Sequence, residues 1–342
     1  MNIQTNIPLS TLTTMRIGGP ANYVCDITSD EDIQQLHQNS KKLGQPVYVM
    51  GGGSNLIARD EGFPGIIARM MIKGVEVLED TKDTCTVSAG AGEIWDDFVK
   101  QMVARELSGI EALSGIPGTV GAAPVQNIGA YGQELADTFV SLEAYDSQTD
   151  SFTTLSKEQC GFSYRHSIFR GDQAGRYIIT RVTMTLKKTR PQPPFYESLQ
   201  RYLEQHQIGT MAVTVHTIRQ AVLEIRSTKL PDPAQIPSAG SFFKNAIVDK
   251  VVAGQLASSY PTMPSYPVDD THVKIPAGWL IETAGLRGKE LHGIKSHDGN
   301  AVVLINQSAT GYSDLAAARQ EIIDTVKEKI GITLAQEPLE MQ

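Results

Sequence analysis

Residues 115–132 read GIPGTVGAAPVQNIGAYG, and a shorter glycine run, GGGSN, occupies residues 51–55. The segments PVYVM (46–50) and CTVSAGAG (85–92) have the composition of strands. Glycine lets main-chain N–H groups approach a phosphate closely, and the serine and asparagine of the shorter run add donors. One such run alone is equally typical of a tight turn. Two runs in one predicted domain, each after a strand, indicate a main chain wrapped around a long phosphate-bearing ligand such as a dinucleotide.

The composition is that of an ordinary globular protein with an acidic balance. The chain has 342 residues, of which 41% are hydrophobic and 20% charged, and its formal net charge is −8. At about 150 residues per domain this length predicts two domains. No block of lysine and arginine stands out, so nucleic acid is not expected as a partner. An anionic ligand must then be held by local devices such as loop N–H groups and a few placed cations.

The cysteines and the chain start indicate a reducing, cytoplasmic compartment. The three cysteines are scattered at positions 25, 85 and 160, which fits neither a disulfide framework nor a zinc site. The start, MNIQTNIPLSTLTT, lacks the basic and apolar regions of a secretory signal. No run of 18 apolar residues occurs, so no membrane span is expected. The seven histidines show no metal-ligand spacing, and no metal is expected.

Hydrophobic periodicity predicts a mixed α and β chain. Helices are expected after Ser29, from Trp95, around 218–225 and from about Ser313, and strand-like alternation covers 139–156 and 176–187. Residues 108–132 are expected to form a long structured loop, a feature that is usually functional. The proline-rich stretch KKTRPQPPF (187–195) predicts a boundary between residues 1–187 and 188–342.

Six motifs, in order and in spacing, carry a resemblance to one family. They are GGGSN, SGIPGTVGAAPVQNIGAYG, CGFSYRHSIF, RSTKLPDP, AGSFFKN and AGWLIE. Together they resemble the UDP-N-acetylenolpyruvoylglucosamine reductases, the MurB flavoenzymes of peptidoglycan precursor synthesis. The resemblance extends from about Thr14 to Glu337, and it implies a cytoplasmic, monomeric oxidoreductase of cell wall biogenesis that needs no membrane.

The resemblance implies an α+β architecture and a bound FAD. Residues 1–187 would form an FAD-binding domain of the vanillyl-alcohol oxidase (PCMH) type. Residues 188–342 would form the MurB C-terminal substrate-binding domain, with its last residues returning to the active site. The residues that match the FAD pyrophosphate loops are Gly51, Gly52, Gly53, Ser54, Asn55, Gly118, Gly121, Ile128, Gly129 and Tyr131. Many relatives have serines at Ala122 and Ala123, so a hydroxyl contact to FAD is absent at both positions.

The implied reaction is the NADPH-dependent reduction of the enolpyruvyl group of UDP-N-acetylglucosamine enolpyruvate, through FAD, to UDP-N-acetylmuramate. Ser241 matches the family's proton donor at C2. A hydroxyl is a very weak acid, but a C2 carbanion or enolate is a base strong enough to take its proton. Arg165 matches the arginine at the substrate carboxylate, which a planar guanidinium suits. Glu337 matches the glutamate that assists the enol intermediate, and it must be protonated to help.

Other residues match positions that line the substrate site. The matching residues are Tyr164, Tyr196, Lys229, Asn245 and Arg287. Among them, Tyr196 fits the lid tyrosine of the longer family type, and Arg287 stands where many members have lysine. The C-terminus departs from the family pattern Leu-Glu-x-Glu-Val-Arg, because it reads LAQEPLEMQ and ends. Glu340 is therefore a second candidate for the catalytic carboxylate, although the spacing from Leu334 favours Glu337.

Simpler readings of the same residues remain open at this point. Without its flanking motif, Ser241 is more typical of a turn serine than of an acid. No G-x-S-x-G elbow is present, which disfavours a serine hydrolase. Another FAD oxidase of the same fold would react with oxygen rather than need NADPH. A non-catalytic flavin-binding protein would keep the glycine runs but would have no reason for Arg165, Ser241 and Glu337 together.

Overall fold

The structure, a computed structural model, describes residues 2–341. Its chain divides into two compact units, and each is described by itself. The first comprises Met1–Ile7, Ala21–Gly52 and Pro64–Ser227, and the second comprises Pro8–Pro20, Gly53–Phe63 and Thr228–Gln342. The boundary between them passes through the GGGSN run, between Gly52 and Gly53.

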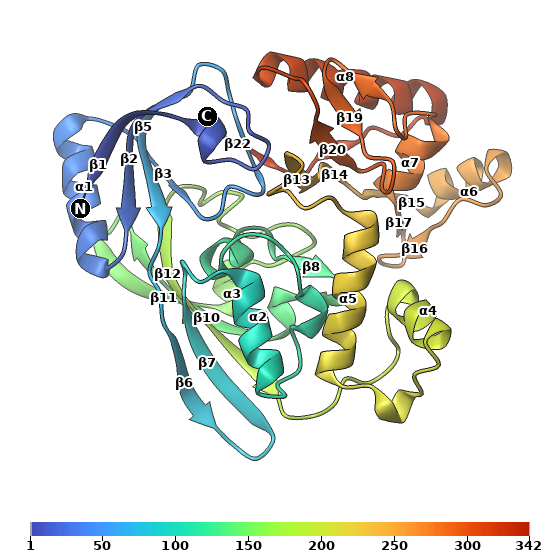
Figure 1. Ribbon diagram of the computed structural model, residues 1–342, viewed down its shortest axis with the longest axis horizontal. Coiled ribbons are helices and arrows are strands. Elements are labelled where there is room, and N and C mark those ends of the chain that lie inside the picture. The colour runs from blue at the N-terminus through green and yellow to red at the C-terminus, as the bar shows by residue number, and fades with distance from the viewer. Residues whose placement is uncertain (1, 342) are drawn as a thin grey trace. The chain divides into compact units, whose positions relative to one another are not determined.

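The first unit is built on two sheets. A four-stranded sheet has the order β1-β2-β5-β3, with β3 parallel to β5. A five-stranded sheet has the order β11-β10-β12-β7-β6, and its neighbouring strands are antiparallel (Figure 1). The strand bounds are β1 (Ile3–Pro8), β2 (Pro20–Ile27), β3 (Val47–Met50), β5 (Phe63–Met70), β6 (Val75–Asp80), β7 (Thr84–Gly90), β10 (Phe139–Asp146), β11 (Ser151–Ser156) and β12 (Tyr177–Lys187).

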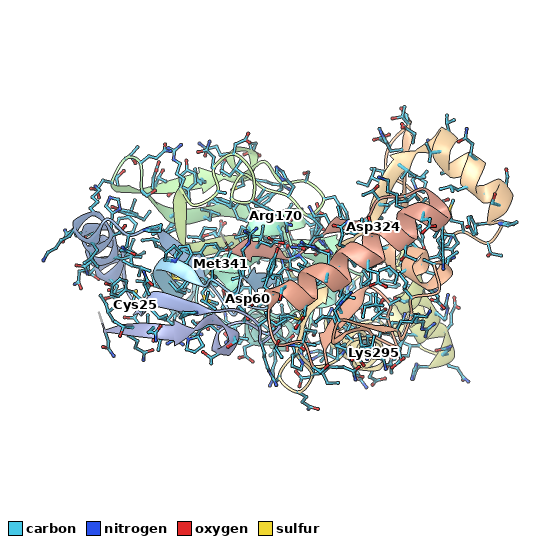
Figure 2. The ribbon with its side chains drawn as sticks, turned by 90° about the horizontal axis from the view of Figure 1, so that it is seen from above. Cys25, Asp60, Arg170, Lys295, Asp324 and Met341 are labelled. Atoms are coloured by element: carbon cyan, nitrogen blue, oxygen red, sulfur yellow. The ribbon has the colours of Figure 1, made fainter. Side chains whose placement is uncertain are left out.

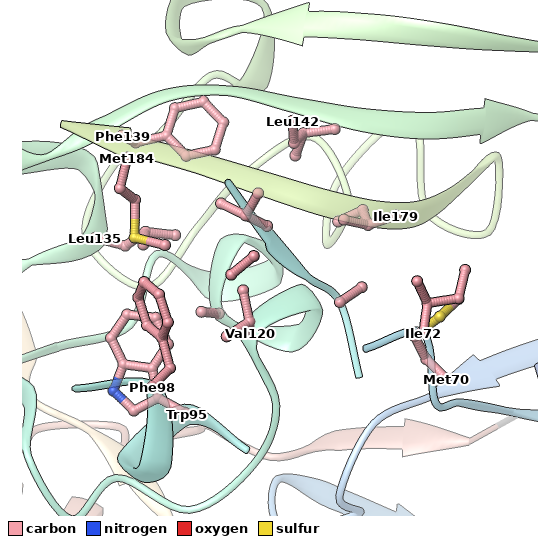
Figure 3. Packing of buried hydrophobic residues seen from close by; sticks show 14 of the residues in the cluster. Met70, Ile72, Trp95, Phe98, Val120, Leu135, Phe139, Leu142, Ile179 and Met184 are labelled. Atoms are coloured by element: carbon pink, nitrogen blue, oxygen red, sulfur yellow. The ribbon is translucent and has the colours of Figure 1, made fainter. Parts of the chain in front are cut away.

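Two helices cover the sheets as their periodicity predicts. Helix α1 (Asp30–Leu43) begins after Ser29, whose hydroxyl accepts from the Asp32 N–H, and ends at Gly44 with φ 61°. Helix α2 (Trp95–Ala104) buries its apolar face in the core of this unit. Figure 3 shows Trp95 and Phe98 of α2 in the same core as Phe139 and Met184 of the five-stranded sheet.

The second glycine stretch is irregular but not without structure. It contains the short 3₁₀ helices η2 (Glu111–Leu113) and η3 (Val120–Gln126), followed by the small strands β8 (Gly129–Ala130) and β9 (Gln133–Glu134). The turn η4 (Leu135–Asp137) and the single-turn helix α3 (Lys157–Cys160) complete the connections. The predicted long structured loop is thus present, with local helical turns that its glycine and proline content concealed.

Two further helices extend the first unit beyond the predicted domain boundary. Helices α4 (Glu197–Gln205) and α5 (Val215–Lys229), with the turn η5 (Thr210–Ala212), share an apolar cluster with Ala112 and Tyr131 of the glycine stretch. Asp96 of α2 forms a fork with Arg219 of α5 through contacts of 2.6 and 2.9 Å. The first compact unit runs on past residue 187 to Ser227, because α4 and α5 pack on it.

The second unit combines small antiparallel sheets with three helices around its own core. Their strand orders are β13-β20-β19-β18, β15-β17-β16 and β14-β21, and β22 runs parallel to β4. The bounds are η1 (Leu9–Thr11), β4 (Leu56–Ala58), β13 (Ser238–Ser241), β14 (Phe243–Lys244), β15 (Ala246–Asp249), α6 (Lys250–Ser259), β16 (Tyr266–Pro267), β17 (His272–Ile275), α7 (Ala277–Thr283), β18 (Glu290–Leu291), β19 (Ile294–Ser296), β20 (Val303–Asn306), α8 (Tyr312–Ile330), β21 (Ala335–Gln336) and β22 (Leu339–Met341).

Helix α8 is the long predicted C-terminal helix. Its buried residues recur at helical spacing and join the core of the second unit; they are Leu315, Ala318, Ile322, Val326 and Ile330. It ends at Gly331, whose φ of 83° is the left-handed conformation that glycine favours at helix ends. Asp60 lies where the helix begins and accepts from the N–H groups of Tyr312 and Ser313, at 2.6 and 3.1 Å (Figure 2).

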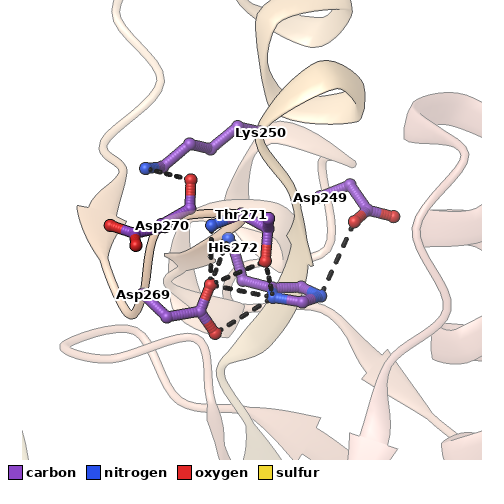
Figure 4. Close-up of polar contacts among 6 residues, drawn as sticks. All are labelled: Asp249, Lys250, Asp269, Asp270, Thr271 and His272. Carbon is purple, nitrogen blue, oxygen red and sulfur yellow. Dashed lines mark hydrogen bonds and ion pairs between the residues drawn. The ribbon is translucent and has the colours of Figure 1, made fainter.

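The turn between β16 and β17 is fixed by side chains rather than by a core. Asp269 accepts from the Thr271 and His272 N–H groups, and the His272 ring lies between Asp269 and Asp249 (Figure 4). Lys250 donates to the Asp270 carbonyl at 2.8 Å. The bonds to Asp269 hold its pKa far below its usual range, with the Thr271 N–H as the largest cause.

Within residues 2–341 no helix combines the length and apolarity that a bilayer crossing requires.

Candidate active site

The two glycine runs touch each other in the first unit. A Cβ added at Gly51, just after β3, would lie 2.4 Å from the Thr119 Oγ1. One added at Gly52 would lie 3.2 Å from the Gly118 Cα. The positions therefore need glycine because the two runs pack closely together, a reason that the sequence argument about phosphate did not include. Of the same run, Gly53, Ser54 and Asn55 belong to the second unit.

The second run is held against the five-stranded sheet. The Gly121 N–H donates to the Ala91 carbonyl at 2.8 Å, and an added Cβ at Gly121 would meet the Ala91 Cβ at 2.4 Å. Gly118 has φ 118°, which favours glycine. Ile128 is buried in the core of this unit. The run is thereby fixed along its length before any ligand binds.

A buried hydroxyl at the meeting point of the runs supports a bound polar group. Thr119 is 7% exposed, and its Oγ1 has no hydrogen-bond partner in the part of the chain that the structure describes. A buried hydroxyl without a partner is costly, and such groups are rare in native proteins. A phosphate oxygen at the runs would accept from it, so the residues present fit the pyrophosphate of FAD. Sequence reasoning missed Thr119, although its place inside GIPGTVG was a usable signal.

The two alanines of the second run have different surroundings. Ala123 is 2% exposed and belongs to the apolar core, so a serine hydroxyl there would be buried among hydrocarbon. Ala122 is partly buried, and its Cβ would lie 3.3 Å from a Cβ built on Gly51. Only Ala122 thus faces the other glycine run. The predicted loss of a hydroxyl contact accordingly concerns Ala122 alone.

Arg165 is brought to the second glycine run in an unusual conformation. Its φ is 53°, a region that non-glycine residues seldom occupy and that often marks functional sites. Its Nη2 donates to the Gly129 carbonyl at 2.7 Å. Its guanidinium also lies over the Tyr164 ring, 5.3 Å from the centroid. Arg165, Tyr164 and Gly129, three predicted site residues, therefore lie together.

The predicted lid residue also lies on the second run. The rings of Tyr196 and Tyr131 meet edge to face with centroids 6.0 Å apart. Tyr196 is half exposed at the start of α4, whereas Tyr131 is partly buried. The side chain of Arg226 in α5 donates to the Tyr131 phenol, and burial raises the pKa of Tyr131. Arg226 and Asp96, which accepts from the Gly115 N–H at 2.6 Å, are supports that the sequence did not reveal.

In the second unit, Ser241 ends a strand on an irregular ladder. Strand β13 pairs with β20, with Ser241 opposite Val303, and the register shifts between Ser238 and Ser241. Gly240, with φ 69°, lies within this irregular stretch. Ser241 is exposed, while Phe242 and Phe243 after it are buried in the core. The paired Phe side chains thus anchor the serine at a fixed place.

Glu337 lies next to the same segment. Its N–H donates to the Phe242 carbonyl at 2.9 Å, in continuation of the pairing of β14 with β21. Glu337 is 7% exposed, an unusual state for a glutamate. The structure therefore brings Ser241 and Glu337, which are 96 positions apart in the sequence, onto facing segments of the second unit.

Glu340, the competing carboxylate, has other partners. It accepts from Arg59 at 3.1 Å, from the Tyr312 phenol at 3.0 Å, and from Arg319. Burial raises the pKa of Glu340, but these three hydrogen bonds outweigh burial and hold the pKa below its usual value. An ionised carboxylate with three donors suits a structural role and not a protonated acid.

The remaining predicted residues lie in the second unit at separate places. The side-chain Oδ1 of Asn245 accepts from the Ala277 N–H at 3.0 Å, at the start of α7. Lys229 is the exposed last residue of α5. Arg287 donates to the Asp298 carbonyl and to the Glu282 carboxylate, at 2.6 and 2.7 Å. Within residues 2–341 no cluster of three His, Cys, Asp or Glu side chains is arranged to hold a metal ion.

The arrangement of glycine runs and sheets defines an FAD-binding protein. Residues 21–154 match the FAD-binding domain family, and residues 232–340 match the C-terminal domain of UDP-N-acetylenolpyruvoylglucosamine reductase. The chain is 39% identical to that reductase from Ralstonia nicotianae over 340 residues, which cover 98% of each chain. It is 40% identical to the reductase from Cupriavidus pinatubonensis, with 97% of each covered.

These similarities show that the chain belongs to the UDP-N-acetylenolpyruvoylglucosamine reductase family. The fold is also similar to that of the Thermus caldophilus reductase (MurB), with a TM-score of 0.70 over the whole of both chains and 24% sequence identity. The predicted FAD-binding fold, the FAD cofactor and the predicted family of oxidoreductases are confirmed.

Proposed function

We propose that the chain reduces the enolpyruvyl ether of UDP-N-acetylglucosamine enolpyruvate to UDP-N-acetylmuramate, with NADPH as reductant, in peptidoglycan precursor synthesis. The observation that carries this proposal is the pairing of the segments that hold Ser241 and buried Glu337, joined by the bond from the Glu337 N–H to the Phe242 carbonyl, in a chain of this family. A hydroxyl donor and a carboxyl are the groups that protonation of an enolate needs.

The glycine runs hold the cofactor. When bound there, FAD would supply hydride transfer between NADPH and C3 of the enolpyruvyl group. The main chain near Gly51, Gly52 and Gly118 would hold its pyrophosphate, with Gly121 keeping the second run in place, and Thr119 Oγ1 would donate to it. These contacts fix the cofactor's position and carry no charge of their own, which is compatible with an acidic chain.

Ser241 supplies the proton for the second half of the addition. Once hydride has reached C3, negative charge develops at C2 of the substrate, beside a carboxylate. The Ser241 hydroxyl donates its proton to C2, and the serine is reprotonated from solvent, to which it is exposed. Its neighbours Phe242 and Phe243 are buried and hold the main chain at Ser241 in place.

Glu337 and Arg165 stabilise the charge that develops on the substrate. Glu337 is 7% exposed, and in this scheme its carboxyl in the neutral form donates a hydrogen bond to the enolate oxygen. Arg165 binds the substrate carboxylate through its planar fork, with Gly129 fixing one edge of the guanidinium. Glu340 is assigned no catalytic role, since its partners keep it ionised.

The outer substrate contacts follow the family positions. We assign Tyr196 to the lid over the UDP moiety, and Lys229 and Asn245 to the neighbourhood of the substrate pyrophosphate and the nicotinamide. Tyr164 and Arg287 are assigned to the lining of the substrate site. The division of labour between residues 1–187, for FAD, and 188–342, for substrate, remains a prediction. A cytoplasmic monomer acting without nucleic acid or membrane fits the acidic composition and the small-molecule substrates.

The test is the anaerobic visible absorbance of the purified protein. We expect a flavin band that bleaches with NADPH and returns when UDP-N-acetylglucosamine enolpyruvate is added. A band that bleaches but does not return would mean a different electron acceptor. A band that returns only with oxygen would identify an oxidase of the same fold.

A further inference from the structure

The C-terminal segment that carries Glu337 is tied to helix α8 on both sides of that residue. The Arg319 Nη1 donates to the Gln336 Oε1 at 2.6 Å and also contacts the Glu340 carboxylate. Gln336 in turn donates from Nε2 to the Pro338 carbonyl at 2.8 Å. The residues immediately before and after Glu337 are therefore bridged to each other, and one arginine holds the bridge.

The position of Arg319 on α8 is fixed by its surroundings. It follows Ala318, which is buried with Ile322 in the core of the second unit, so the helix does not turn about its axis. The Arg319 side chain is 22% exposed, which limits competition from water. The Arg319 and Arg59 guanidiniums lie over the Tyr312 ring, at 6.0 and 5.5 Å from its centroid.

The far end of the segment is secured by the same cluster. Strand β22 pairs in parallel with β4, and Arg59 follows β4 directly. Arg59 and the Tyr312 phenol both donate to Glu340, and Asp60, the next residue, accepts from the N–H groups at the start of α8. Donors from α8 and from Arg59, which follows β4, thus meet at the Glu340 carboxylate of β22 and keep its pKa low.

We infer that Arg319 is a positioning residue for the reduction, which places the Glu337 carboxyl by fastening Gln336 and Glu340. This inference rests on the proposed role of Glu337 as the carboxyl that assists the substrate. A displacement of about 1 Å at a reacting group lowers a rate by about 100-fold, so a loosened tail is costly to catalysis. Arg319 itself touches neither substrate nor cofactor in this scheme.

The variants are Arg319→Met, which keeps the apolar stem and removes both bonds, and Arg319→Lys, which retains one charged donor. Gln320→Ala is the matched control, since Gln320 is the next residue of α8 and is exposed, with a bond only to Asp324. The first readout is amide hydrogen exchange of the peptide that contains residues 332–341. We expect faster exchange in Arg319→Met, partial recovery in Arg319→Lys, and no change in Gln320→Ala.

The second readout separates the two half-reactions under anaerobic conditions. For Arg319→Met we expect flavin reduction by NADPH within about twofold of the parent and reoxidation by substrate slowed by about 10- to 100-fold. Unchanged exchange, unchanged reoxidation, or an equal loss in both half-reactions would overturn the inference. If Glu337→Gln leaves reoxidation unchanged, the proposed role of Glu337 fails first. If Glu337→Gln is slow and Arg319→Met is not, only the positioning role fails.

Discussion

The N–H of Glu337 donates to the carbonyl of Phe242 at 2.9 Å, in continuation of the pairing of β14 with β21. Glu337 therefore lies opposite Phe242, the residue that follows Ser241. We expect Glu337→Gln to slow reoxidation of the reduced flavin by about 10²- to 10⁴-fold, because an amide cannot supply the proton that a neutral carboxyl shares. Reduction by NADPH should be unchanged. Stopped-flow absorbance of each half-reaction measures both.

Glu340→Gln is the comparison that separates the two carboxylates. Glu340 accepts from Arg59, Tyr312 and Arg319, so its loss of charge should lower the free energy of unfolding by about 1–3 kcal/mol. Its effect on reoxidation should be smaller than that of Glu337→Gln. Urea unfolding measures the change in stability, and the same stopped-flow assay measures the reoxidation rate. If Glu340→Gln slowed reoxidation more than Glu337→Gln, the catalytic carboxylate would be reassigned to Glu340.

Ser241→Ala should slow reoxidation by about 10²- to 10⁴-fold, because an alanine side chain has no proton to give to C2. The free energy of unfolding should change little, since Ser241 is exposed and its main-chain pairing does not need the hydroxyl. Ser258→Ala, at an exposed serine of α6, is the control. Equal rates for the two variants would rule out Ser241 as the acid.

Gly51→Ala should weaken FAD binding by about 1–3 kcal/mol, because the new methyl group would overlap the Thr119 Oγ1 and push the glycine runs apart. Thr119→Val should also weaken binding, by removal of the donor. Gly254→Ala in α6, where an added Cβ meets no atom within 4 Å, should bind FAD as the parent does. Fluorescence titration of the FAD-free protein measures each affinity, and an unaltered affinity in Gly51→Ala would refute the close approach.

The fork between Asp96 and Arg219 should carry more stability than an exposed ion pair. Arg219 is 13% exposed, so Asp96→Ala leaves its charge partly buried and should lower the free energy of unfolding by about 3 kcal/mol. Glu197→Ala removes an exposed pair with Arg201 on α4 and should cost less than about 1 kcal/mol. Chemical denaturation of the two variants gives the comparison; similar costs would mean that the fork is not important for α5.

Local patterns predicted the first unit better than the second. The helix after Ser29, the helix from Trp95 and the strand 176–187 each have a period and an end signal that a short window contains. Strands such as β14 and β21 have two residues each, so no period exists to detect. Helix α6 has only Ala253 buried, and it gave no apolar face to recognise.

The residues of the candidate site also differ in how well the sequence predicts them. Gly51 and Gly118 could be read from the sequence because their chemistry is in the main chain and needs no distant partner. The roles of Thr119 and Arg319 depend on contacts with residues far from them in the chain, which composition does not encode. Likewise Glu337 and Glu340 are three residues apart and chemically alike, and only their partners distinguish them.

Asp146 should set part of the acid stability of the first unit. Arg176 donates to both its carboxylate oxygens, at 2.9 and 2.6 Å, and the Gln148 N–H donates at 2.9 Å. These bonds, that from Arg176 first, lower the pKa of Asp146 from 3.8 to about 2. The folded state therefore binds this proton less readily than the unfolded state does, so the stabilisation is complete above pH 3.8 and is lost as the pH falls toward 2.

Asp146→Asn should consequently be less stable than the parent at pH 7, and the difference should shrink as the pH is lowered through 4 toward 2, the range between the two pKa values. Asp172→Asn, at an exposed carboxylate of the same unit, should show no such convergence. Urea unfolding at a series of pH values measures the difference. A gap that stays constant with pH would contradict the prediction, because a stabilisation that depends on the ionised Asp146 must fade as the carboxylate is protonated.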